Sequence, residues 1–142
     1  MEKTFIPEGE TPCASQIGAT LEALCGTIES RREAGEESYT HRLLTDKLDT
    51  VLKKVMEESG EVALAAKDTE RAQRFGTADE ADAEVDHLRY EAADVVYHLL
   101  VVLARFGITL DEFAAELNTR MTAEERPEGG VCLVPEHVKR GK

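Results

Sequence analysis

Residues 91–105 read EAADVVYHLLVVLAR, and this stretch decides the fold class. Apolar residues occupy nearly every position from Ala92 to Ala104, which predicts a helix that is buried on most of its faces. Two polar side chains, Asp94 and His98, interrupt the run, and it is too short to span a bilayer. We therefore predict the central helix of a soluble all-α protein, in which these two side chains face the core or a site.

Helical periodicity on both sides predicts three further helices in a chain of 142 residues, which is enough for one core. Thr77 or Asp79 is expected to cap the central helix, and Thr109 the last one, with Glu112 as its capping-box partner. The expected helices cover residues 15–34, 45–67, 77–105 and 109–121. We predict a compact four-helix bundle over residues 16–121, preceded by a flexible arm over 1–15 and followed by an extended tail over 122–142.

The composition excludes several classes of function. The net charge of -12 argues against a general nucleic-acid-binding protein, because phosphate backbones require a basic surface. The three cysteines form no CxxC or Cys/His pattern, so neither a zinc site nor a disulfide framework is expected. Free thiols are typical of a reducing compartment, and the first residues contain no apolar stretch of signal-peptide length. We therefore expect a cytoplasmic protein that does not interact with membranes.

Two pairs of carboxylates carry the chemistry. Residues 54–61 read KVMEESGE, in which Glu58 and Glu61 lie three residues apart on one helical face. The same spacing separates Glu91 from Asp94 in the central helix. Four carboxylates brought together repel one another unless a cation lies between them, and oxygen ligands suit Mg²⁺, with Mn²⁺ as a substitute. The sequence predicts a magnesium site formed by these four residues.

Less specific interpretations of the same residues stay open. A glutamate-rich helix more often presents a solvated face, so Glu58 and Glu61 alone would be weak evidence of a site. Asp94 equally fits a hydrogen-bonded core carboxylate, and His98 fits a core histidine. A di-iron site fits poorly, because neither Glu58 nor Glu91 is followed by a histidine three residues later.

Three segments of the chain resemble a known family. They are residues 21–40, which include Arg31-Arg32 and Ser38-Tyr39-Thr40, residues 53–67, and residues 90–101. Together they resemble the all-α, MazG-like nucleoside triphosphate pyrophosphohydrolases, and within them the phosphoribosyl-ATP pyrophosphohydrolases of histidine biosynthesis. The resemblance covers about residues 17–121. One departure is the segment 68–89, which is longer than in the family and is expected to lengthen the connection or the start of the central helix.

The resemblance implies a reaction and roles for several residues. Phosphoribosyl-ATP and water would give phosphoribosyl-AMP and pyrophosphate, with Mg²⁺ held by the four carboxylates and with Glu57 or Glu58 accepting a proton from water. The expected substrate-binding residues are Arg31, Arg32, Ser38, Tyr39, Thr40, Lys54 and His98. The alternative is a MazG-like house-cleaning pyrophosphohydrolase that acts on other nucleoside triphosphates through the same metal site.

Two further expectations concern partners. The central helix is apolar on more faces than one small bundle covers, so, as the resemblance also implies, we expect a homodimer. A non-enzymatic, acidic helical partner protein is a third class of function, which the two matched carboxylate pairs disfavour.

Overall fold

The computed structural model describes residues 5–6 and 8–134. Within these residues the chain forms helices and no strand, which confirms the all-α class. A single 3-10 turn, η1 (Arg31–Glu33), follows the first α-helix. The α-helices are α1 (Gln16–Ser30), α2 (Tyr39–Thr45), α3 (Leu48–Phe75), α4 (Ala78–Arg105) and α5 (Leu110–Asn118).

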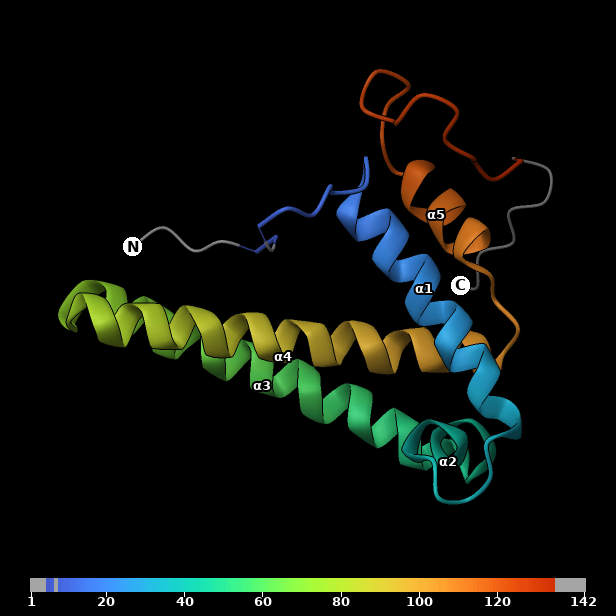
Figure 1. Ribbon diagram of the computed structural model, residues 1–142, viewed down its shortest axis with the longest axis horizontal. Coiled ribbons are helices and arrows are strands. Elements are labelled where there is room, and N and C mark those ends of the chain that lie inside the picture. The colour runs from blue at the N-terminus through green and yellow to red at the C-terminus, as the bar shows by residue number, and fades with distance from the viewer. Residues whose placement is uncertain (1–4, 7, 135–142) are drawn as a thin grey trace, which may run out of the picture.

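A long antiparallel hairpin of α3 and α4 dominates the architecture (Figure 1). The helices α1 and α2 pack against one end of this hairpin, where α3 begins and α4 ends, and the opposite end projects beyond them (Figure 1). The buried apolar core lies at the packed end, where α1, α2, α3 and α4 all contribute to it. Its buried members are Ile28, Leu43, Leu44, Val51, Leu100 and Val101.

The hairpin is longer than the sequence pattern predicts. We expected the helix of residues 45–67 to end near Lys67, whereas α3 continues to Phe75 and is followed by only two residues before α4. Ion pairs of Glu70 with Lys67 at 2.7 Å and with Arg74 at 3.0 Å support the added turns, because residues three and four apart are neighbours on a helix. The extra residues of segment 68–89 therefore lengthen both helices of the hairpin rather than a loop.

The hairpin turn is set by local chemistry. A Cβ atom on Gly76 would lie 2.8 Å from the carbonyl oxygen of Ala72, so the close approach at this position requires glycine. Of the two predicted caps, Thr77 is the one that caps α4, and the side chain of Glu80 completes a capping box with the backbone of Thr77.

A short helix, α2, lies between the helices predicted over residues 15–34 and 45–67. The hydroxyl oxygen of Ser38 accepts a hydrogen bond from the His41 backbone N–H and caps α2. The next turn buries Leu43 and Leu44, which are 1% and 6% exposed. This apolar pair is the sequence feature that indicates α2. The pair is too short to show helical periodicity, so the helix was not predicted.

The segment that follows α5 makes specific contacts as far as residue 134. The Asn118 side-chain amide donates a hydrogen bond to the carbonyl oxygen of Val131, and the Leu133 N–H donates to the hydroxyl of Thr119. Residues 135–142 of the predicted tail lie outside the described residues. No single helix in residues 5–6 and 8–134 is long and apolar enough to cross a membrane. Only α4 and α5 taken together meet that test, and they are bent by 112° at the break between them.

Candidate metal site

Three of the four predicted carboxylates meet in the middle of the hairpin. Glu58 and Glu61 lie one turn apart on α3, and Glu91 faces them from α4. One carboxylate oxygen of each residue lies within 4.8 Å of the others. Glu58 and Glu91 are buried, at 5% and 7% exposure, and Glu61 is half-buried. Such a cluster of negative charge is unfavourable by itself and suits a cation with oxygen ligands.

The two oxygens of Glu91 differ in their surroundings. Oε1 lies 2.8 Å from Nε2 of His87, which is four residues earlier on α4. Oε2 is buried and has no hydrogen-bond partner among the residues that the structure describes. An unpaired buried carboxylate oxygen is costly, so this atom is available to a ligand from outside the chain. A hard divalent cation such as Mg²⁺ fits this set of donor atoms, which consists of oxygen alone.

Lys54 partly balances the charge of the cluster. Its Nζ atom lies 2.9 Å from Oε1 of Glu58 and 3.5 Å from Oε2 of Glu57. The hydrogen bond from Lys54 lowers the pKa of Glu58, while the same contact raises the pKa of Lys54. The adjacent carboxylate of Glu58 raises the pKa of Glu61, and the charge of Glu91 adds to this effect.

The fourth predicted carboxylate, Asp94, lies one turn further along α4 and is not part of this cluster of three. Its side chain is half-buried. It still belongs to the same neighbourhood, because its charge acts on the Tyr39 hydroxyl together with that of Glu58. The pKa of Tyr39 is raised chiefly by burial, and both carboxylates raise it further, whereas Lys54 lowers it.

The start of α2 is joined to α4 beside the carboxylates. The Nδ1 atom of His98 lies 2.8 Å from the carbonyl oxygen of Asp94, and its Nε2 atom lies 2.9 Å from the Tyr39 hydroxyl. A carbonyl only accepts, so Nδ1 carries the hydrogen and Nε2 accepts from the tyrosine. His98 is 4% exposed, which matches its interpretation as a core histidine that orients Tyr39. The Thr40 and Tyr97 hydroxyls form a second link.

The remaining predicted site residues occupy different surroundings. Glu57 is half-exposed beside Lys54 and outside the cluster of three. Ser38 caps α2 through its hydroxyl. Arg31 is exposed on η1. None of these three residues belongs to the cluster of Glu58, Glu61 and Glu91.

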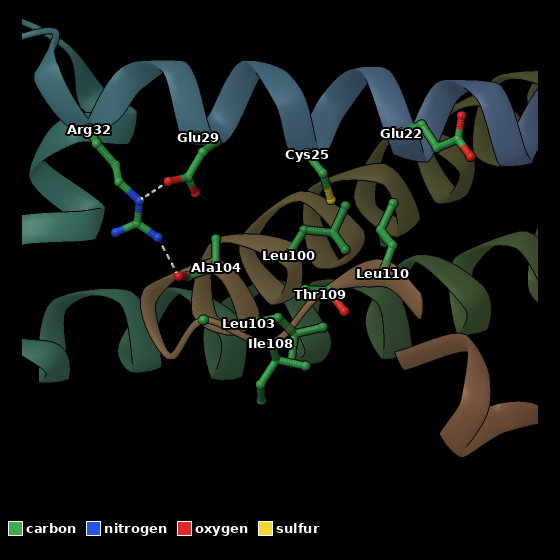
Figure 2. Close-up of a pocket in the computed structure, with 11 residues that line it drawn as sticks. Glu22, Cys25, Glu29, Arg32, Leu100, Leu103, Ala104, Ile108, Thr109 and Leu110 are labelled. Atoms are coloured by element: carbon green, nitrogen blue, oxygen red, sulfur yellow. Dashed lines mark hydrogen bonds and ion pairs between the residues drawn. The ribbon is translucent and has the colours of Figure 1, made fainter. Parts of the chain in front are cut away.

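Arg32 lies in another part of the molecule. Its guanidinium pairs with Glu29 and donates to the carbonyl oxygen of Ala104, at one end of a largely apolar cavity of about 410 Å³ between α1, α4 and the loop that follows α4 (Figure 2). Ala104 lies thirteen residues beyond Glu91, which corresponds to about 20 Å along the helix axis. Within one chain, Arg32 is therefore remote from the carboxylates.

His87 is not among the residues predicted for the site. It lies within the helix predicted over residues 77–105, in the segment 68–89 that is longer than in the family. Its signal is the spacing of four residues from Glu91, which puts both side chains on one face of that helix.

Comparison with known proteins identifies the family. Residues 21–121 match the family described as phosphoribosyl-ATP pyrophosphohydrolase. The chain is 36% identical over 122 residues to "Phosphoribosyl-ATP pyrophosphatase" of Dechloromonas aromatica, which covers 85% of this chain and 93% of that protein. It is 40% identical over 113 residues to the protein of the same name from Limosilactobacillus fermentum, covering 76% of this chain and 93% of the relative.

A third relative has two functions in its name. The "Histidine biosynthesis bifunctional protein HisIE" of Thermus thermophilus is 37% identical over 111 residues, which cover 78% of this chain and 44% of that protein. No solved structure matches the chain. The family match spans both helices that carry the carboxylates and most of the described core. The chain belongs to the phosphoribosyl-ATP pyrophosphohydrolase family.

Proposed function

We propose that this protein hydrolyses phosphoribosyl-ATP to phosphoribosyl-AMP and pyrophosphate in histidine biosynthesis, and that the reaction depends on Mg²⁺. The observation that carries the proposal is the cluster of Glu58, Glu61 and Glu91 with one buried, unpaired oxygen. The substrate follows from the names of the relatives, which are phosphoribosyl-ATP pyrophosphatases over most of their length.

The metal would be held by Glu58, Glu61 and Glu91, with Asp94 available on the next turn of α4. When bound, it supplies positive charge for the polyphosphate oxygens and makes a water molecule more acidic. Mn²⁺ would serve as a substitute, because it accepts the same oxygen ligands. Glu58 and Glu91 are the buried members of this set, and Glu61 is half-buried.

Side chains around the cluster would bind the substrate and move a proton. Lys54 carries a positive charge next to Glu58 and can meet a phosphate oxygen. The hydroxyl of Tyr39 donates its hydrogen to His98, so its oxygen can accept a hydrogen bond from a hydroxyl of the substrate. Glu57 lies beside Lys54 with access to solvent, and in this proposal it accepts the proton of the attacking water.

The proposal includes a homodimer. The hairpin exposes large apolar side chains that the single chain leaves uncovered, and Leu52, Met56 and Val96 are 38%, 77% and 40% exposed. Leu52 and Met56 lie four residues apart and share one face of α3. A second copy that covers this face would bury apolar surface that is unfavourable in water.

A cytoplasmic location is also part of the proposal. All three cysteines are free thiols, which is the usual state of cysteine in a reducing compartment.

The test of the reaction is release of pyrophosphate from phosphoribosyl-ATP and from a panel of nucleoside triphosphates, with and without Mg²⁺. We expect turnover of phosphoribosyl-ATP that EDTA abolishes and Mg²⁺ or Mn²⁺ restores. The Glu61→Ala and Asp94→Ala variants should lose this activity while keeping their helical circular dichroism. Equal turnover of ordinary nucleoside triphosphates would favour the house-cleaning alternative, and normal turnover by either variant would refute that residue's role as a ligand.

Light scattering tests the dimer separately. We expect the wild type and Met56→Leu to have the mass of two chains at micromolar concentration, because leucine preserves the apolar contact. Met56→Glu should shift the mass toward one chain, since it would bury an unpaired charge. A wild type that is monomeric at this concentration contradicts the dimer.

A further inference from the structure

We infer that His87 is a positioning residue for the metal ligand Glu91: it holds one carboxylate oxygen and thereby leaves the other to a cation. This inference deepens the proposed function and rests on the metal site within it. It concerns a residue outside the predicted site, one turn before Glu91 on α4.

The contact of His87 with Glu91 is direct and specific. Nε2 of His87 lies 2.8 Å from Oε1 of Glu91, which is the length of a good hydrogen bond. An ionised carboxylate only accepts hydrogen bonds, so Nε2 carries the hydrogen and a neutral imidazole is sufficient. The other ring nitrogen, Nδ1, lies 3.9 Å from Oε2 of Glu84. The imidazole is therefore flanked by two carboxylates of its own helix.

Burial differs sharply between the two partners. The side chain of His87 is 53% exposed, whereas that of Glu91 is 9% exposed. His87 therefore contacts Glu91 from the solvent side, whereas Glu58 and Glu61 approach it from α3. This contact restrains Glu91 from rotating away from two neighbouring negative charges.

The second oxygen explains why such a restraint matters. Oε2 of Glu91 is buried without a partner among residues 5–6 and 8–134. If a hydrogen bond only had to satisfy Glu91, both oxygens would benefit from one. The observed division leaves one oxygen oriented and one unpaired, which is the arrangement expected of a ligand that a neighbouring group orients.

The expected loss of Mn²⁺ affinity can be estimated from the general effect of residues that hydrogen-bond to metal ligands. Loss of a hydrogen-bond partner of a metal ligand typically weakens metal binding by about 10- to 100-fold. We expect His87→Leu to raise the dissociation constant for Mn²⁺ by about 10-fold, because Glu91 is a shared rather than a sole ligand. His87→Gln is the matched control, since its side-chain amide can donate from nearly the same point as Nε2. It should keep most of the affinity.

The experiment is a titration of the full chain with Mn²⁺ in the absence of substrate. The concentration of free Mn²⁺ is measured at each step by electron paramagnetic resonance. Circular dichroism checks that both variants fold. Activity then separates the roles: the Mg²⁺ concentration for half-maximal rate should rise in His87→Leu, while kcat at saturating Mg²⁺ stays close to that of the wild type. Equal Mn²⁺ affinity of folded His87→Leu and wild type would overturn the inference, as would a His87→Gln variant as weak as His87→Leu.

Two further outcomes separate this inference from its alternatives. Electron spin echo measurements detect a histidine nitrogen bound directly to Mn²⁺, and such a signal that disappears in His87→Leu would overturn the positioning role. If phosphoribosyl-ATP is not turned over but Mn²⁺ binding shows the expected dependence on residue 87, the proposed substrate fails and the inference stands. If phosphoribosyl-ATP is turned over normally and metal binding is unchanged in His87→Leu, the proposed function stands and the inference about His87 fails.

Discussion

Replacing Glu91 with glutamine removes one negative charge from a buried cluster of three and should stabilise the protein in the absence of metal. The three oxygens lie within 4.8 Å of one another, and two unit charges at that limit repel each other by about 3.5 kcal/mol at an effective dielectric constant of about 20. Lys54 already offsets part of the charge of Glu58, and solvent screens part of that of Glu61. We therefore expect a net gain of about 2 kcal/mol in the free energy of unfolding.

The assay is thermal unfolding by circular dichroism in EDTA and again in excess Mg²⁺, at about pH 8, which lies above the ordinary titration range of histidine. In EDTA the Tm of Glu91→Gln should exceed that of the wild type by about 4–8 °C. Added Mg²⁺ should reverse the order, because a ligand at 100 times its Kd stabilises the wild type by about 2.7 kcal/mol and the variant has lost a ligand. The amide oxygen of the variant can still accept from His87, so that contact is preserved.

Two results would refute this reasoning. A lower Tm of Glu91→Gln in EDTA would mean that the three carboxylates do not repel one another as their separation implies. An undiminished rise of Tm on addition of Mg²⁺ would mean that Glu91 does not bind the ion.

Three other predictions concern stability measured by urea unfolding. Lys54→Met should cost about 2–3 kcal/mol near neutral pH, because it leaves the buried Glu58 unpaired. Lys54 lowers the pKa of Glu58 in the folded state, so the stability that the pair contributes is present above the unfolded pKa of about 4.3 and is lost as the pH falls through the folded pKa. A difference in stability between wild type and Lys54→Met that persists at about pH 2 would contradict this explanation. Thr109→Ala should cost about 1 kcal/mol through loss of the α5 cap, with the exposed Thr20→Ala within about 0.5 kcal/mol of the wild type. Leu43→Ala should cost about 2–5 kcal/mol, since Leu43 is 1% exposed, and a smaller loss would mean that the end of the hairpin is loosely packed.

Local chemistry explains why several features were predictable from the chain alone. The helix caps at Thr77 and Thr109 depend on a side chain and a backbone group only three residues apart, so each is visible in the sequence. The spacing of Glu58 and Glu61 likewise decides that both lie on one face of whichever helix contains them. Burial of the central helix follows from its nearly continuous apolar composition.

Features that depend on contacts between distant segments were not predictable in the same way. The extent of α3 beyond Lys67 depends on ion pairs and on burial of Thr69 and Ala72 against α4, so the polar composition of this segment was misleading. The remote position of Arg32 depends on how α1 crosses α4. Its link to the carbonyl oxygen of Ala104 joins residues that are 72 positions apart.

The carboxylate site shows where the division between sequence and tertiary structure lies. Spacing along the chain decided that Glu91 and Asp94 share a face of α4, and nothing in it ranks one above the other as a partner of Glu58. That ranking depends on the register of α4 against α3. Asp94 lies three residues beyond Glu91, which corresponds to about 4.5 Å along the helix axis. This shift is nearly as large as the 4.8 Å within which the three carboxylates lie, so Glu91 belongs to the cluster and Asp94 does not. The contact of His87 with Glu91 follows from their spacing of four residues on α4, whereas only the packing of the hairpin brings Glu91 to Glu58 and Glu61.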